Sequence, residues 1–91
     1  MKYIKASFIN VPISGLVDTG STVFIIKRSF VKSRGLEEFL VGTKKIITVA
    51  EGRRKVLHHK LEGQLYTKDF SVYASFYVTD DLPVEVQIGC I

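Results

Sequence analysis

The stretch Leu16-Val17-Asp18-Thr19-Gly20-Ser21 decides how this sequence is interpreted. It places a carboxylate directly after two apolar residues of a predicted strand and before a glycine that permits a sharp turn. A carboxylate at the end of a buried strand costs free energy unless it is paired or hydrogen-bonded. One explanation is local, because an Asp side chain can accept hydrogen bonds from the backbone of its own turn. The other explanation is chemical, an aspartate positioned to act on a substrate.

The residues on either side of this stretch predict short strands more than helices. Before it, apolar and polar residues alternate over 4–8, which is the two-residue period of a half-buried strand. Asn10 and Pro12 predict a turn, because Asn tolerates bent backbone and Pro cannot donate to a strand ladder. A second strand is expected over 13–17. After the stretch, the continuous apolar run Val23–Ile26 predicts a strand that is buried on both faces.

One short helix is expected next. Ser29 is predicted to cap its N-terminus, and Phe30 and Val31 are predicted to face the interior. Gly35 is predicted to end it, because glycine is the preferred residue just past a helix C-terminus. A helix of two turns at most depends on tertiary packing for its stability.

The remainder of the chain predicts further strands and turns. The strands are expected at residues 44–49, 56–66, 70–78 and 84–88. A hairpin tip is expected at Ala50-Glu51-Gly52-Arg53 and a second turn at residues 67–69. About seven short strands and one short helix predict a mainly β fold, a small closed β barrel.

Length and composition bound the class of protein. The 91 residues leave room for one small domain over 1–91, and 46% hydrophobic and 24% charged residues are typical of a globular chain. No apolar run approaches ~18 residues, so we expect no membrane span. The single cysteine, Cys90, cannot form an internal disulfide, and residues 1–5 do not resemble a signal peptide. Both observations favour a cytoplasmic protein.

Charge is distributed unevenly along the chain, although the net charge is only +4. All thirteen Lys and Arg lie in residues 2–68 with five carboxylates, a balance of +8, whereas residues 69–91 hold four carboxylates and no basic residue. An acidic partner, a contact between two copies, or a mixed solvated surface would each fit this pattern. The aromatic and basic residues do not interleave as in an RNA-binding sheet, so we expect no nucleic acid partner.

Two adjacent histidines, His58 and His59, raise the question of a metal site. Adjacent residues of a strand point to opposite faces, so the pair cannot hold one ion without a bend. No cluster of cysteines or carboxylates accompanies them in the sequence. We therefore expect packing or surface histidines, and neither a metal nor an organic cofactor.

The order of these segments resembles the single-domain, retroviral-type branch of the aspartic proteases, the retropepsin-like family. Residues 16–21 resemble the catalytic loop of that family, apolar-apolar-Asp-Thr-Gly-Ser. Residues 29–36 resemble its short helix ending in Gly-Leu, and residues 50–52 stand where the family carries its flap. Residues 86–89 resemble its second element, which packs behind the catalytic loop through Ile88 and Gly89. The resemblance extends over nearly all 91 residues.

The resemblance implies a role for each residue of the loop and of the flap. Asp18 would be the catalytic residue, and Thr19 would form a hydrogen bond to its counterpart in a second chain. Gly20 would let the substrate backbone approach, and Ser21 would support the loop. The flap, which would close over a peptide, would comprise Ala50, Glu51, Gly52 and Arg53.

The chemistry requires a second carboxylate. Hydrolysis by carboxylates uses one protonated and one ionised group that share a water, because like charges ~3 Å apart cannot both ionise. The chain holds one Asp-Thr-Gly, since Asp69, Asp80 and Asp81 are not followed by Thr-Gly. Two chains related by a two-fold axis would each have to supply Asp18. The sequence therefore predicts a homodimer.

Two features depart from the family pattern. Gln87 stands where the family usually has a second apolar residue before the glycine. The helix that normally follows Gly89, and the intersubunit strand that retroviral members add, do not appear among the 91 residues. We expect an aspartic endopeptidase that hydrolyses peptide bonds as a homodimer. The alternative is a non-cleaving peptide-binding or assembly module with the same fold.

Overall fold

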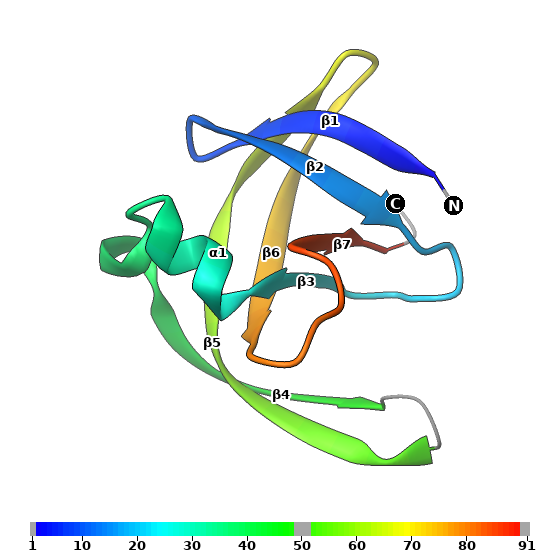
Figure 1. Ribbon diagram of the computed structural model, residues 1–91, viewed down its shortest axis with the longest axis vertical. Coiled ribbons are helices and arrows are strands. Elements are labelled where there is room, and N and C mark those ends of the chain that lie inside the picture. Colours follow the sequence, from blue (N-terminus) through cyan, green and yellow to red (C-terminus); the bar gives the residue numbers. More distant parts are fainter. Residues whose placement is uncertain (1, 49–51, 90–91) are drawn as a thin grey trace.

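The structure, a computed structural model, describes residues 2–48 and 52–89 and consists mainly of strands. The elements in chain order are β1 (Tyr3–Phe8), β2 (Val11–Val17), β3 (Phe24–Lys27), α1 (Arg28–Ser33), the 3₁₀ turn η1 (Glu37–Phe39), β4 (Val41–Thr48), β5 (Arg54–Thr67), β6 (Ser71–Thr79) and β7 (Val86–Ile88). The strand order is β1-β2-β7-β3-β6-β5-β4, and a further pairing of β1 with β5 closes a ring of six strands. The predicted mainly β, closed barrel with one short helix is confirmed (Figure 1).

The core fills the ring of strands, as the sequence pattern of β6 requires. Ala74, Phe76 and Val78 are buried along one face of β6 because successive side chains of a strand alternate between faces. The ring of Phe76 lies 4.5 Å from that of Phe8 of β1, so the two strands that flank β5 in the ring also meet inside the barrel. Phe30 of α1 belongs to the same buried cluster, which is why so short a helix is stable here.

The turn between β1 and β2 differs from the expectation. Ile9 and Asn10 form it, both with positive φ, of 50° and 59°, whereas Pro12 lies inside β2 opposite Ser7. Positive φ at both central residues is the signature of a type I′ hairpin turn. In such a hairpin Phe8 and Val11 exchange hydrogen bonds, so Ser7 and Pro12 form a non-hydrogen-bonded pair. The missing N–H of Pro12 therefore removes no bond to β1.

The helix ends where it was predicted to end but begins differently. It starts at Arg28, directly after Lys27 of β3, and no side chain caps it, so the prediction that Ser29 is the cap is wrong. Lys27 still pairs with Thr79 of β6, so β3 continues into α1 without an intervening turn. At the other end Gly35 has a φ of 68°, and the Leu36 N–H donates to the Val31 carbonyl at 3.0 Å. This is the Schellman ending that favours glycine.

A two-stranded arm leaves the barrel. β5 is 14 residues long, and its first half pairs with β4 while its second half pairs with β6 and β1. The arm, β4 with the first half of β5, extends beside the barrel, and the end of β4 and the start of β5 lie on the same side as the loop between β2 and β3 (Figure 1). Of the predicted hairpin tip, Gly52 has the positive φ, 76°, and Arg53 precedes β5. Ala50 and Glu51 lie outside the described residues.

The helices of the described residues are all short. None of them is long and apolar enough to cross a membrane.

Candidate active site

The loop that follows β2 holds Asp18 in a defined position. Val17 pairs in parallel with Ile88 of β7, and the Asp18 N–H donates to the Ile88 carbonyl at 2.9 Å. The Ser21 N–H then donates to the Asp18 carbonyl at 3.1 Å, which closes a turn over residues 18–21. The backbone of Asp18 is thus held on both sides, by β7 and by its own turn.

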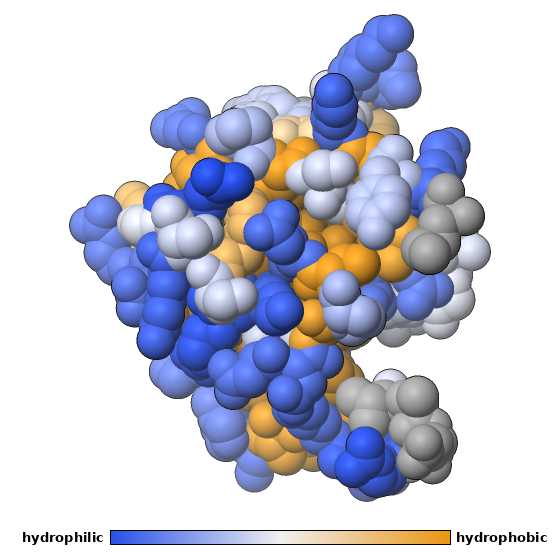
Figure 2. All heavy atoms as spheres, viewed as in Figure 1, coloured by the Kyte–Doolittle hydropathy of each residue, from blue (hydrophilic) through white to orange (hydrophobic). Residues whose placement is uncertain are grey.

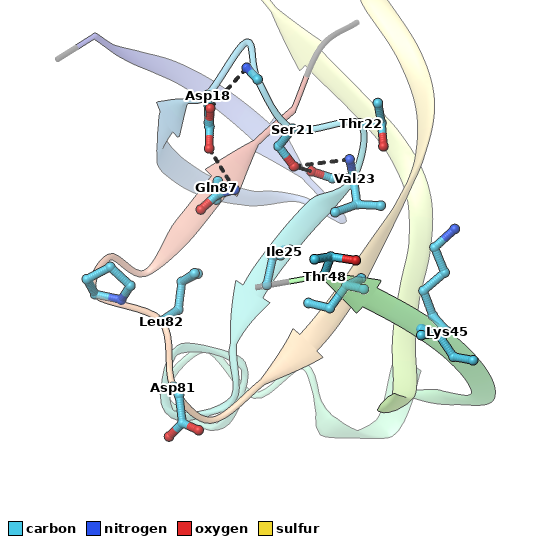
Figure 3. A pocket seen from close by; sticks show the side chains of 14 residues that line it. Asp18, Ser21, Thr22, Val23, Ile25, Lys45, Thr48, Asp81, Leu82 and Gln87 are labelled. Carbon is cyan, nitrogen blue, oxygen red and sulfur yellow. Dashed lines mark hydrogen bonds between the residues drawn. The ribbon is translucent and has the colours of Figure 1, made fainter. Parts of the chain in front are cut away.

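The carboxylate of Asp18 is exposed and has two hydrogen-bond donors (Figure 3). Its Oδ1 accepts from the Gly20 N–H at 3.0 Å, the local arrangement that an Asp before a tight turn can form. Its Oδ2 lies 3.4 Å from Nε2 of Gln87, which donates from β7. The local bond orients the side chain and leaves the carboxylate accessible, so the local and chemical explanations of this aspartate are compatible.

Gly89 and Ile88 lie directly behind this loop. A Cβ on Gly89 would stand 2.6 Å from the Val23 carbonyl oxygen and 2.8 Å from that of Ser21, so a larger residue could not fit without moving the loop. Ile88 is fully buried, and its side chain fills the space over Gly15 of β2. The hydroxyl of Ser21 donates to the Val23 carbonyl at 3.1 Å and so joins the loop to the start of β3.

A cleft of about 720 Å³ opens beside Asp18, between the loop, the arm and the segment that follows β6. The space-filling view shows the molecule hollowed between the arm and the barrel (Figure 2). Fourteen residues line the cleft: Asp18, Gly20, Ser21, Thr22, Val23, Ile25, Lys45, Ile46, Ile47, Thr48, Asp81, Leu82, Pro83 and Gln87. Thr19 is exposed and belongs to the turn, but it does not line the cleft.

The arm forms one wall of this cleft through β4. Ile47 of β4 is buried with Ile25, Leu57 and Leu82 in a small cluster separate from the main core. Gly52 follows β4, and a Cβ there would meet nothing within 4 Å, so only its positive φ favours glycine. The predicted flap residues Gly52 and Arg53 therefore belong to the end of the arm that extends past the cleft.

The arm is attached to the opposite wall near its free end, where Lys55 pairs with Ile47. Nζ of Lys55 lies 2.9 Å from Oδ2 of Asp81 and donates to the hydroxyl of buried Thr79 at 3.0 Å. The hydrogen bond and the positive charge of Lys55 lower the pKa of the Asp81 carboxyl below its ordinary value of 3.8. This contact joins β5 to the segment that carries Leu82 and Pro83.

One residue of the cleft wall, Asp81, was not singled out as a site residue from the sequence. It meets Lys55 across 26 positions of the chain, and no motif relates the two. The sequence did mark Gln87 as unusual, because it stands where an apolar residue was expected. Only the structure shows that its amide lies beside Asp18. The histidines alternate as expected, with His58 exposed and His59 half-buried, and the described residues contain no group of three metal-ligating side chains.

With this geometry in place, the comparisons with known proteins identify the class. The chain belongs to the aspartyl protease family, whose model matches residues 4–90. Among solved structures it is similar to the crystal structure of the retroviral protease-like domain of Ddi1 from Leishmania major, with a TM-score of 0.66 and 18% sequence identity. The match covers 99% of this chain and 68% of that one, and it supports the retropepsin-like fold. No curated protein matches the sequence.

Proposed function

We propose that this protein is an aspartic endopeptidase that acts as a homodimer. The observation that carries the proposal is the exposed Asp18 carboxylate at the mouth of the cleft, oriented by the Gly20 N–H at 3.0 Å. Membership of the aspartyl protease family supports peptide hydrolysis as the reaction. A cytoplasmic location is part of the proposal and is supported by the single cysteine of the sequence.

Each chain would contribute one Asp18. The described residues contain one Asp-Thr-Gly turn, and a single carboxylate cannot serve as acid and base toward the same water. In a two-fold dimer the two Asp18 turns would face each other, with the ionised carboxylate accepting a proton from water and the protonated one donating to the peptide carbonyl oxygen. The exposed Thr19 side chains would stabilise the paired turns.

The cleft supports an extended peptide as substrate. Its apolar wall, Val23, Ile25, Ile47 and Leu82, can receive apolar side chains, and β4 offers an adjacent strand wall. Gly52 and Arg53 at the end of the arm would act as the flap that covers the bound peptide. No metal or organic cofactor is part of the proposed reaction.

A second function is favoured by one contact. Nε2 of Gln87 lies 3.4 Å from Oδ2 of Asp18, at a position where the family usually has an apolar residue. An amide that occupies this oxygen would compete with the hydrolytic water, and the chain would then bind peptides without cleaving them. Asp18 would in that case serve as a polar contact for the bound peptide.

Cleavage of an unfolded protein distinguishes the two functions. The purified chain is incubated with reduced, alkylated casein at mildly acidic pH, and new N-termini are quantified. Asp18→Asn preserves the acceptor of the Gly20 bond and serves as the control for contaminating proteases. Cleavage by the native chain that the variant lacks would support the endopeptidase, whereas saturable binding without cleavage would support the binding module.

A further inference from the structure

A second pocket, of about 380 Å³, adjoins the cleft near the free end of the arm. It shares four lining residues with the cleft, namely Ile25, Ile47, Asp81 and Leu82, and adds Arg53, Arg54, Lys55 and Thr79. Asp18 lines the cleft and not this pocket. The pocket is therefore placed to contact part of a bound chain away from the reacting bond.

The floor of this pocket is apolar. Ile25, Ile47 and Leu82 are each at most 9% exposed and pack together in one cluster. An aliphatic stem would lose water on this floor and gain free energy from its burial. A compact, fully hydrated ion would find no matching surface there.

The polar lining of the pocket is strongly basic. Its three basic residues face one carboxylate, a formal balance of +2. Lys55 is already neutralised, because its ammonium contacts Asp81 at 2.9 Å and Thr79 at 3.0 Å. None of the three ion pairs found among residues 2–48 and 52–89 includes Arg53 or Arg54. The two guanidinium groups therefore carry the positive charge of the pocket.

Strand alternation distinguishes the two arginines. Val56 is 38% exposed and Leu57 only 3%, so β5 turns Leu57 and Lys55 toward the barrel and Val56 away from it. Arg54 falls on the face of Val56. Arg53 precedes β5 by one residue, and a continuation of the same alternation would place it on the side of Lys55, two positions later. Arg53 is thus the better placed of the two to meet a group inside the pocket.

We infer that this pocket receives the acidic side chain of a peptide bound in the cleft, and that Arg53 recognises it. A guanidinium binds a carboxylate through two parallel hydrogen bonds, and the apolar floor accommodates the methylene groups of glutamate. The inference rests on the proposed function only in that the occupant is a peptide. The cleft would therefore select peptides that carry a glutamate beside an apolar segment.

Binding to a chain that cannot cleave tests this directly. Fluorescein-labelled peptides with a central Val-Leu-Phe-Val segment carry Glu, Gln or Lys at each flanking position in turn. Their affinity for the Asp18→Asn chain is measured by fluorescence anisotropy. At one flanking position we expect the Glu peptide to bind about two- to fivefold more tightly than the Gln peptide, the range that partly exposed charge pairs provide. The difference should shrink as salt is added.

Variants of the arginines locate the effect. Arg53→Gln should abolish the preference for Glu, Arg54→Gln should reduce it less, and Arg53→Glu should turn it into a preference for the Lys peptide. Lys68→Gln removes the same charge at the opposite end of β5, in the exposed turn before β6, and should change nothing.

The outcomes separate this inference from the proposed function. Equal binding of the Glu and Gln peptides, or binding of neither, would overturn the inference even if the native chain cleaves casein. A Glu preference without any cleavage would support the inference and count against the endopeptidase. Tighter binding of a labelled single-stranded oligonucleotide, lost in Arg53→Gln, would overturn it in favour of a phosphate-binding pocket.

Discussion

Lys55 and Asp81 lie 26 positions apart in the sequence, yet their side chains meet at 2.9 Å and join the two walls of the cleft. Lys55 belongs to the arm, and Asp81 belongs to the segment between β6 and β7. Thr79, which is 5% exposed, accepts a second hydrogen bond from the same ammonium. The arm is therefore tied to the barrel near its free end, two residues after Arg53.

This ion pair should determine how firmly the arm is held to the barrel as the pH falls. The lowered pKa of Asp81 means that the pair stabilises the attached arm above pH 3.8, and that this contribution disappears as the pH falls through the lower, folded-state value. Asp81→Asn should increase amide hydrogen exchange in β4 and the first half of β5 at neutral pH, and the difference from the native chain should vanish once the pH falls below the lowered pKa of Asp81. The effect will be modest because the Asp81 side chain is 83% exposed.

A matched variant serves as the control for this experiment. Asp80, the residue before Asp81, pairs with Arg28 of α1 at 2.8 Å, and no ion pair among the described residues joins Asp80 to the arm. Asp80→Asn should leave hydrogen exchange in the arm unchanged. Equal exchange in the native chain and Asp81→Asn at neutral pH would show that the contact does not hold the arm.

The second prediction concerns the reaction itself. If two Asp18 groups act together as acid and base, the cleavage rate should fall on both sides of an acidic-to-neutral optimum, because the reaction needs one protonated and one ionised carboxylate. Asp18→Asn should lower the rate by about 10²–10⁴-fold or more with little change in thermal stability. The measurement is the pH profile of peptide cleavage beside a melting curve. Retained cleavage in the variant would place the site elsewhere.

The third prediction concerns the end of the arm. Gly52 has a φ of 76°, which a β-branched residue adopts only with strain of about 1–2 kcal/mol. Gly52→Val should therefore displace the flap and lower turnover by up to about 10²-fold, since small misplacements over a substrate are costly. The comparison variant is Gly35→Val, which has a similar φ of 68° beyond α1. It should lower the melting temperature and leave the kinetics unchanged, whereas normal turnover in Gly52→Val would remove this turn from the mechanism.

The fourth prediction concerns assembly. If each active site uses Asp18 from two chains, as proposed, specific activity should rise with protein concentration and saturate where sedimentation detects the dimer. Thr19→Ala should shift both curves to higher concentration, because it removes the proposed hydrogen bond between the paired turns. Ser29→Ala removes an exposed hydroxyl from α1 and serves as the control. A chain that remains monomeric at high concentration and still cleaves peptides would contradict the shared site.

The fifth prediction concerns Gln87. Replacing this amide by leucine removes the donor 3.4 Å from Oδ2 of Asp18 and restores the apolar type usual in the family. If the amide competes with the hydrolytic water, Gln87→Leu should cleave faster than the native chain, with peptide affinity little changed. The kinetics of one labelled peptide, with kcat and KM resolved, provide the measurement. An unchanged kcat would mean that this contact does not limit the reaction.

The order of elements in this protein follows from local patterns in its sequence. Alternation along β6, the continuous apolar run of β3 and the glycine after α1 each specify a structure through neighbouring residues alone. The same is true of the turn at Asp18, where the Asp, its two neighbours and Gly20 are sufficient to predict a held carboxylate. Periodicity and turn chemistry act over a few residues, so they can be interpreted without the fold.

The corrections arose where pairing with a distant strand overrode a local preference. Ser29 is a good capping residue, but the pairing of Lys27 with Thr79 places the start of the helix two residues earlier, with Lys27 at the N-cap position. The local sequence predicts that Pro12 lies in a turn. The register of β1 with β2 instead places Pro12 at a strand position where no backbone N–H is required to bond β1. Strand register depends on the whole sheet, so it cannot be inferred from a single segment of the sequence.

The walls of the candidate site were likewise decided only by the tertiary structure. The sequence by itself was sufficient to identify Asp18 as the candidate reactive group, because the motif around it consists of contiguous residues. Gln87 beside Asp18, Lys55 on Asp81 and the two arginines over an apolar floor come from segments that the barrel brings together. Side-chain contacts between distant segments depend on how strands cross and pack, so the specificity of the cleft emerges only in the folded chain.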